Sequence, residues 1–308
     1  MTMTSASTPA TEAPLAIATR LHLGHASHPP PNLRDMLTSF ITLAQTIGAN
    51  HAVIAVDAAE RITGYDLVDE VTKICNPPPT DLTPSDNNVR IHILPVTPWG
   101  KFVPALNAIV SHVATLSAKY VLMTSAEVQL SQDVLTIMKS KLDLEKTLVV
   151  GTVLPGHDYR YSRQAAVQNE EVGASEKVLD DKGVEVELTG RTTPWNTCSL
   201  WNVSKLSLTG FLLVSEGLHP EEDGSELGSS AGVEEVCTIA TLQRILGPGN
   251  AQAKLITLPG EESTSWETQN FENDAKRKDW HEKKMASKVS RAKRQLELLG
   301  LSGTVIHC

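Results

Sequence analysis

The sequence predicts an α/β fold in which helices cover both faces of a mostly parallel central sheet. Short apolar runs alternate with segments of helical periodicity from Leu15 to about residue 154, which is typical of parallel sheets. The apolar runs are nearly continuous, as in strands that are buried on both faces. The chain has 308 residues, enough for one large domain or two small ones, and its 41% hydrophobic and 20% charged residues are ordinary for a globular protein with a sizeable core.

The elements of the first half follow from this alternation. Residues 1–14 are rich in Ser, Thr and Pro and are expected to form a disordered tail. The prolines that precede Leu33 suit the first turn of a helix. Strands are expected at Leu15–Thr19, His51–Ala58, Val89–Val96, Tyr120–Met123 and Thr147–Leu154, and helices at Leu33–Ile47, Tyr65–Ile74 and Phe102–Leu116.

The second half is less regular. Residues 156–191 are polar and are expected to form an insertion that contains one short strand, VEVEL. The segment AKLITLPG is predicted to be the last strand, and residues 266–308 a charged C-terminal helix that follows the domain. A helix is predicted within residues 231–246, with an inward face formed by Val236, Ile239, Ala240, Leu242 and Ile245.

Composition and charge exclude several classes of protein. The net charge of −9 argues against a nucleic-acid partner, because phosphate contact needs a basic face. The four cysteines form no CxxC pair, which favours reduced thiols over a disulfide framework. The N-terminus has no apolar signal region, and no stretch approaches the roughly 18 apolar residues of a membrane span. A soluble, cytoplasmic protein without an integral membrane segment is expected.

Polar residues follow three of the predicted strands. Asp57 ends the second strand, Trp99-Gly100-Lys101 follows the third, and Ser125-Ala126-Glu127 follows the fourth. In open parallel sheets ligands bind beyond the carboxyl ends of the strands. The sequence therefore predicts that these three tips meet at one crevice.

The order of motifs resembles that of GT-A fold glycosyltransferases of the family-2 type. The segment WGKFVPALNAIVSHVATLSAKYVLMTSAEVQLS is similar to that family's Gly-Lys, Ala-Leu-Asn, helix, strand and Asp-x-Asp turn. TPWNTCSLWNVSKLSLTGF resembles its acceptor-side segment, and AGVEEVCTIATLQRI resembles its Glu-Asp helix. The resemblance implies one domain over residues 15–265, with a nucleotide-binding half at 15–154 and an acceptor half at 155–265.

This resemblance also implies a function. The chain would move a sugar, with inversion, from a nucleotide-diphospho-sugar to an acceptor that the sequence does not identify. Glu235 aligns with the acidic residue that acts as catalytic base, and Glu234 would make supporting hydrogen bonds. The alternative for the pair is an acidic first turn that the helix dipole favours.

The Asp-x-Asp position is degenerate in this chain. Two carboxylates there would hold Mg²⁺ or Mn²⁺ against the diphosphate, and the metal would neutralise the leaving group. Ser125 replaces the first carboxylate and would hydrogen-bond the ribose or a phosphate of the nucleotide. Glu127 retains an oxygen ligand in place of the second carboxylate. A weakly held divalent cation at Glu127 is expected, and helix capping is the alternative for this residue.

Further residues are candidates for the nucleotide site. Asp57 would accept hydrogen bonds from the base or ribose, unless it only closes a turn. Gly100 permits close approach of a ligand, and Lys101 offers a point charge to a diphosphate. Trp99 would stack on a base or pack under its loop. Asn107 would bind ligand or its own helix, and the two roles are equally compatible with the sequence.

Trp195, Asn196 and Trp201 are candidates for the acceptor wall, because indole faces stack on sugar rings. Tryptophan is also a common core residue, so the sequence leaves both roles open for Trp195 and Trp201. His157 follows the fifth strand and is interpreted as a loop histidine rather than a ligand.

Two other functions fit parts of the pattern. The loss of both aspartates of the Asp-x-Asp turn is compatible with a catalytically inactive GT-A-like protein that binds a ligand or serves as a scaffold. Sugar-phosphate nucleotidyltransferases share a similar sheet, but they open with a glycine-rich loop after the first strand. Here that position reads RLHLGHASHPPP, with a single glycine, which disfavours this class.

Overall fold

The computed structural model describes residues 13–22, 31–58, 66–76, 89–160, 178–179, 183–216, 233–258, 264–266 and 275–308. The predicted disordered tail lies almost wholly outside these ranges, as do residues 161–177 of the polar insertion. In the described part of the chain, no helix is both long and apolar enough to cross a membrane.

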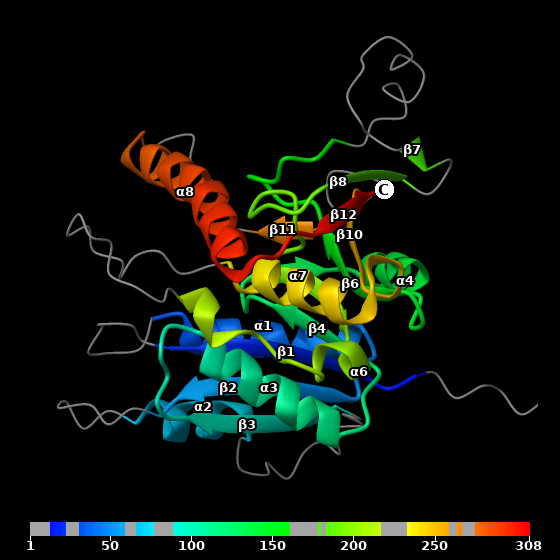
Figure 1. Cartoon of the computed structure of the whole chain (residues 1–308). Helices are drawn as coiled ribbons and strands as arrows, with labels where there is room; N and C mark the ends of the chain where they lie inside the picture. Colours follow the sequence, from blue (N-terminus) through cyan, green and yellow to red (C-terminus); the bar gives the residue numbers. More distant parts are fainter. Residues whose placement is uncertain are drawn as a thin grey trace, which may run out of the picture.

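Ten strands form one sheet in the order β3-β2-β1-β4-β9-β6-β10-β12-β8-β7 (Figure 1). Their bounds are β1 Leu15–Leu21, β2 His51–Asp57, β3 Arg90–Val96, β4 Tyr120–Thr124, β6 Thr147–Thr152, β7 Val178–Leu179, β8 Gly183–Glu187, β9 Cys198–Asn202, β10 Gln252–Ile256 and β12 Thr304–His307. A separate two-stranded sheet pairs β5 (Val128–Leu130) with β11 (Thr264–Trp266).

Helices link the strands. Their bounds are α1 Leu33–Thr46, α2 Leu67–Cys75, α3 Val103–Thr115, α4 Gln132–Lys141, α6 Val203–Leu206, α7 Glu234–Leu246 and α8 Ala275–Leu299, with 3₁₀ turns η2 at Leu213–Glu216 and η4 at Pro248–Asn250. Capping side chains explain where two of these helices begin. The Asp66 carboxylate accepts the Asp69 N–H at the start of α2, and the Ser131 hydroxyl accepts the Val134 N–H at the start of α4.

The sheet is parallel through β3, β2, β1 and β4, and again through β6, β10 and β12. β9 runs antiparallel between β4 and β6, and β8 runs antiparallel beside β12. This confirms the predicted α/β fold with a mostly parallel sheet and a small antiparallel part. The strands in the middle of the sheet are buried along their whole length, which explains their nearly continuous apolar sequence.

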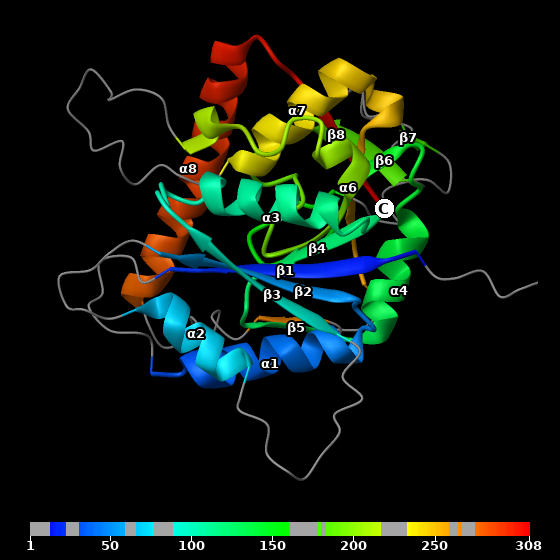
Figure 2. The same ribbon diagram turned by 90° about the horizontal axis from the view of Figure 1, so that it is seen from below.

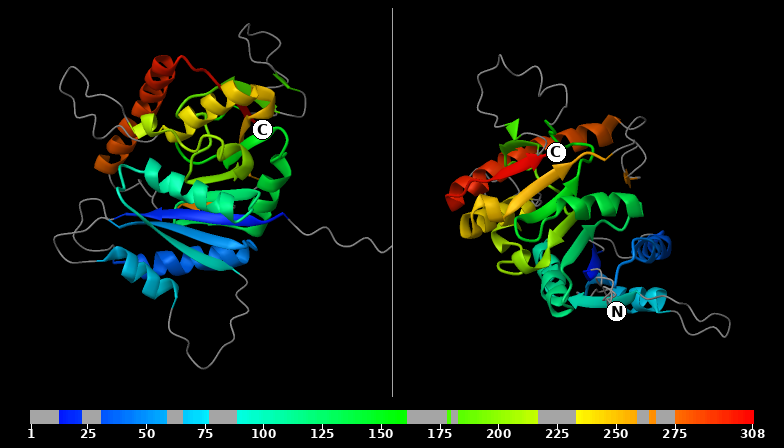
Figure 3. Two further views of the ribbon diagram at one scale, coloured as in Figure 1. Left: turned by 60° about the horizontal axis from the view of Figure 1, so that its bottom comes forward. Right: turned by 90° about the vertical axis from the view of Figure 1, so that its right-hand side faces the viewer.

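Two apolar clusters cover the two faces of the sheet. One contains the buried side chains of α1, α2 and α4, and the other those of α3, α6, α7 and the C-terminal part of α8. Figure 2 shows α1 and α2 on one side of β1–β3 and α3 on the other, and Figure 3 shows the same layers from two further directions. Each helix therefore buries one apolar face on the sheet, as its periodicity predicts.

The parallel register brings the predicted strand ends to one edge. Leu21 of β1 lies opposite Val56 of β2, and Ala18 of β1 lies opposite Met123 of β4. Arg20 and Ser125 each lie two residues beyond that second pair. The polar residues that follow β1, β2 and β4 thus share the carboxyl edge of the sheet.

Three features differ from the prediction. Ile245 is 57% exposed, because it lies nine residues after buried Val236 and therefore on the opposite side of α7. The short strand β5 separates the polar tip from α4. The predicted C-terminal helix ends at Leu299, and Thr304–His307 then form β12 between β10 and β8. Four residues are too few to show a periodic signal in the sequence.

Candidate active site

A cavity of about 360 Å³ opens at the carboxyl edge of β1 and β4. Five segments that are distant in the sequence line it: the end of β1, the tip after β4, the first turns of α3, residues 195–197 before β9, and the start of α7. Met36 of α1 and Lys288 of α8 complete the lining. A cavity therefore lies at the predicted edge, but of the three predicted tips only Ser125-Ala126-Glu127 lines it.

Glu234 and Glu235 lie in the first turn of α7, and both carboxylates are buried at the cavity wall. Their surroundings differ. Oε1 of Glu235 accepts the N–H of Asn196 at 2.7 Å. Oε1 of Glu234 lies 3.9 Å from Nη2 of Arg20, and its Oε2 is buried without a hydrogen-bond partner. One carboxylate is thus held by the backbone, and the other presents an oxygen without a hydrogen bond.

Burial raises the pKa of the Glu234 carboxyl from 4.5 to about 7. The negative charge of Glu235 acts in the same direction. The positive charges of Arg20 and Lys288, and the backbone N–H of Glu234 itself, oppose the shift. A carboxyl in this range exchanges a proton near neutral pH, which is the property that a general base or acid requires.

This shift makes a prediction for stability. Because the pKa of Glu234 is higher in the folded chain, its protonated carboxyl contributes to the free energy of unfolding. This contribution is fully present below pH 4.5 and is lost as the pH rises through about 7. Glu234→Gln does not ionise and should stabilise the protein well above pH 7 by about 3 kcal/mol, but hardly at pH 4.5. Urea unfolding at both pH values measures this, with exposed Glu297→Gln on α8 as the control. An equal effect at the two pH values would contradict the buried, protonated carboxyl.

The tip after β4 places Ser125 and Glu127 in the cavity wall. The backbone N–H of Ser125 donates to the Thr197 carbonyl at 3.1 Å, which fixes the tip against the segment that leads into β9. Within the described residues, no three His, Cys, Asp or Glu side chains come together in a way that could hold a metal ion. The tip offers one carboxylate and one hydroxyl, a weaker ligand set than the two carboxylates of an Asp-x-Asp turn, so a divalent cation at Glu127 stays a prediction.

Two of the three predicted acceptor residues line the cavity, namely Trp195 and Asn196. The indole N–H of Trp195 donates to the Gly190 carbonyl at 2.9 Å, and its ring stacks on His157 with centroids 3.8 Å apart. Both ring nitrogens of His157 lie within hydrogen-bond distance of backbone carbonyls, which agrees with its interpretation as a loop histidine.

Trp201 belongs to the core. It is 0% exposed, packs edge-on against Phe211 at 5.3 Å, and does not line the cavity. Its indole N–H donates to Oδ1 of Asn196 at 3.0 Å and to Oγ of Ser199 at 2.8 Å. Trp201 therefore supports Asn196 from behind, and an acceptor cannot reach it.

The cavity lining includes none of three residues that were predicted to bind the donor, namely Asp57, Trp99 and Asn107. Asp57 is buried at the end of β2, on the edge where the cavity opens but outside its lining. Trp99 is buried and packs 5.5 Å from the His22 ring, and His22 lines the cavity. Asn107 turns away from the cavity: it accepts the Phe211 N–H at 2.7 Å and donates to the Phe211 carbonyl at 2.9 Å. Its role is to hold a turn.

Glu216 organises the start of α3, a role that the sequence did not indicate. Its Oε1 accepts the backbone N–H groups of Lys101, Phe102 and Val103 at 3.2, 2.7 and 2.5 Å. Nζ of Lys101 donates to the Glu216 carbonyl at 2.8 Å. Gly100 has φ +63° and leaves room for this carboxylate, because a Cβ there would lie 3.1 Å from Oε2. Gly100 and Lys101 thus contact Glu216 and do not line the cavity.

Two cationic residues of the cavity wall, Arg20 and Lys288, were missed from the sequence. Arg20 follows the predicted end of the first strand by one residue, so the rule that selected Asp57 also applies to it. Lys288 lies on a helix with many charged residues, and no local signal distinguishes it from its neighbours. Only the packing of α8 brings it to the cavity.

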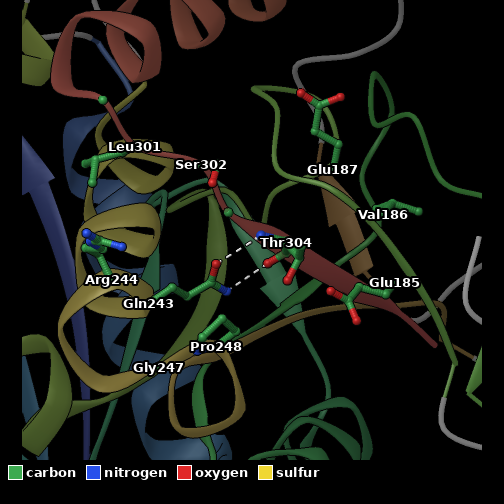
Figure 4. Close-up of a pocket in the computed structure, with 12 residues that line it drawn as sticks. Glu185, Val186, Glu187, Gln243, Arg244, Gly247, Pro248, Leu301, Ser302 and Thr304 are labelled. Carbon is green, nitrogen blue, oxygen red and sulfur yellow. Dashed lines mark hydrogen bonds between the residues drawn. The ribbon is translucent and has the colours of Figure 1, made fainter. Parts of the chain in front are cut away.

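A second cavity, of about 770 Å³, lies between the C-terminal end of α7 and strands β8 and β12 (Figure 4). None of the predicted site residues lines it. Gln243 closes one wall, because its amide exchanges two hydrogen bonds of 2.9 Å with the backbone of Thr304. The charged residues Glu185, Glu187 and Arg244 are spread around it and do not converge on one point.

Comparisons with known proteins give distant structural likenesses. No protein-family model and no curated protein sequence matches the chain. Among solved structures, S. aureus TarS 1–349 in complex with UDP is 13% identical, with a TM-score of 0.42 over 82% of this chain and 59% of that chain. The same TarS fragment in complex with UDP-GlcNAc is 12% identical, with a TM-score of 0.40 over 81% and 60%. The chain thus spans about three fifths of the TarS fragment.

Proposed function

We propose that this chain transfers a sugar from a nucleotide-diphospho-sugar to an acceptor, with inversion at the anomeric carbon. The observation that carries the proposal is the buried pair Glu234 and Glu235 on the wall of a cavity at the carboxyl edge of a parallel sheet. The motif order in the sequence, which resembles that of GT-A glycosyltransferases, adds support.

The reaction needs a group that accepts one proton. The acceptor oxygen attacks the anomeric carbon, the bond from that carbon to the phosphate oxygen breaks, and its electron pair leaves with the nucleoside diphosphate. The hydroxyl proton of the acceptor passes to a carboxylate. Asn196, whose N–H donates to Glu235, and Trp195 line the same cavity, and we assign the acceptor to their side of it.

Glu234 is the better candidate for the base. Oε1 of Glu235 is occupied by the Asn196 N–H, whereas Oε2 of Glu234 is buried without a hydrogen bond. Burial raises the pKa of Glu234 to about 7, so the ionised form that is present at neutral pH accepts a proton readily. Glu235 then holds the segment before β9 in place. These roles are the reverse of those that the resemblance implies.

A thermal-shift panel tests the proposal. Wild-type protein is heated with UDP, GDP or CDP and with their common sugar conjugates, each with Mg²⁺, with Mn²⁺ and with EDTA. Because only the folded state binds, ligand at 100 times its Kd should stabilise the protein by about 2.7 kcal/mol, a readily measured shift. We expect one nucleoside diphosphate to act selectively, and its sugar conjugate to be hydrolysed or transferred.

The same panel distinguishes an inactive binding protein from the proposed transferase. A catalytically inactive GT-A-like protein would shift with a nucleotide sugar but would not release nucleoside diphosphate from it. A chain that shifts with none of these nucleotides would contradict the proposed donor class.

A further inference from the structure

We propose that Arg20, assisted by Lys288, anchors the donor's diphosphate in the place that a divalent cation would occupy. This inference rests on the proposed function and concerns how the same cavity neutralises the leaving group. A nucleoside diphosphate leaves with more negative charge than it carries within the sugar nucleotide, so a cation must stand close to it. The tip at Ser125 and Glu127 supplies one carboxylate where an Asp-x-Asp turn supplies two, which leaves more of the charge to be neutralised by other groups.

Arg20 has the position that this role requires. It lies on β1 two residues beyond Ala18, and Ser125 lies two residues beyond Met123 of β4, the partner of Ala18. Arg20 and Ser125 therefore have matching positions on neighbouring strands. Its guanidinium lies 5.1 Å from the centroid of the Phe102 ring, which holds it at the cavity wall. Nη1 is buried without a hydrogen-bond partner. A guanidinium presents its donors as a rigid fork that matches two phosphate oxygens, and such a buried donor is costly unless a ligand satisfies it.

Lys288 supplies the second positive charge. Its Nζ lies 3.7 Å from the centroid of the Trp195 ring, so the ammonium stands over the indole face at the cavity wall. An aromatic face stabilises a cation without neutralising it. Arg20 and Lys288 thus bring two charges to the cavity from opposite ends of the chain, where a metal site would bring one divalent ion.

The anchor and the proposed base are coupled. Arg20 lies beside Glu234, with 3.9 Å between Nη2 and Oε1. An anion that takes hydrogen bonds from Arg20 competes with Glu234 for it and adds negative charge beside the carboxylate. Glu235 and Lys288 are further charged groups around Glu234. Burial lowers the pKa of Arg291 on α8, and the negative charge of Glu234 opposes this change. Binding of a diphosphate should therefore be accompanied by proton uptake at Glu234.

Isothermal titration with inorganic pyrophosphate and with UDP, in EDTA and in Mg²⁺, tests the anchor. We expect both ligands to bind in EDTA and Arg20→Met to weaken binding at least 10-fold. Lys288→Met should weaken it several-fold, and Arg20→Lys should recover part of the affinity. The controls are Arg160→Met and Lys293→Met, whose exposed side chains lie outside the cavity and should leave affinity unchanged. If Arg20→Met is unstable, Arg20→Met/Glu234→Gln removes both charges and keeps the comparison.

Proton uptake is measured by repeating the titration at pH 7 in buffers of different ionisation enthalpy. Uptake that disappears in Glu234→Gln supports the coupling. Ligand binding that requires Mg²⁺ and is unchanged in Arg20→Met would overturn the anchor and leave the proposed transferase intact. Pyrophosphate binding that depends on Arg20, without tighter binding of any nucleotide, would support the anion site and contradict the nucleotide-sugar donor. Absence of binding by any of these ligands would overturn both.

Discussion

Glu234→Gln should lower kcat for sugar transfer by about 10²–10⁴-fold, the usual contribution of a positioned general base. The substitution keeps the size of the side chain and removes its ability to accept the acceptor's proton. Because burial places the pKa of Glu234 at about 7, wild-type kcat/KM for the donor should rise with pH up to about that value and then level off. The value of kcat reports the donor-bound enzyme and should level off at a higher pH, because bound diphosphate raises the pKa of Glu234. Initial rates of nucleoside diphosphate release between pH 5 and 9 measure both effects.

Glu235→Gln is the matched control for this prediction. The amide oxygen of glutamine can still accept the Asn196 N–H that Oε1 of Glu235 now accepts at 2.7 Å. We therefore expect a loss of less than about 10-fold, well below the range for a general base. If Glu235→Gln abolished turnover and Glu234→Gln did not, the base would be Glu235, as the resemblance to the glycosyltransferases implies, and the assignment to Glu234 would be wrong.

Trp201→Ala should destabilise the protein by about 3–5 kcal/mol, the usual cost of truncating a buried aromatic side chain. The Trp201 side chain is 0% exposed and packs against Phe211 in the cluster that contains α3 and α7. Its removal would leave a cavity and would deprive Asn196 and Ser199 of the indole donor. Urea unfolding followed by circular dichroism measures the change.

Trp201→Phe separates the two causes, because it keeps most of the ring volume and loses only the N–H. A smaller loss of about 1–3 kcal/mol is expected, as for buried acceptors left without a donor. A Trp201→Ala protein with unchanged stability and a raised KM for the acceptor would instead support a place on the acceptor wall.

The sequence by itself determined the layered architecture. The apolar strands His51–Asp57 and Thr147–Thr152 and the periodic helix Val103–Thr115 have their predicted types and nearly their predicted ends. Local signals suffice there, because a strand buried on both faces must be apolar throughout and a packed helix must repeat every 3.6 residues. Strand ends then indicated the crevice, because parallel strands bring their carboxyl ends to one edge.

Only the tertiary structure decided which polar residues face the cavity. Lys101 and Asn107 carry the right chemistry, but contacts with Glu216 and Phe211, more than 100 residues away in the sequence, direct them elsewhere. Lys288 reaches the cavity only because α8 packs beside α7. The unequal surroundings of Glu234 and Glu235 also depend on distant partners, since burial and hydrogen bonding are properties of the assembled core rather than of adjacent residues.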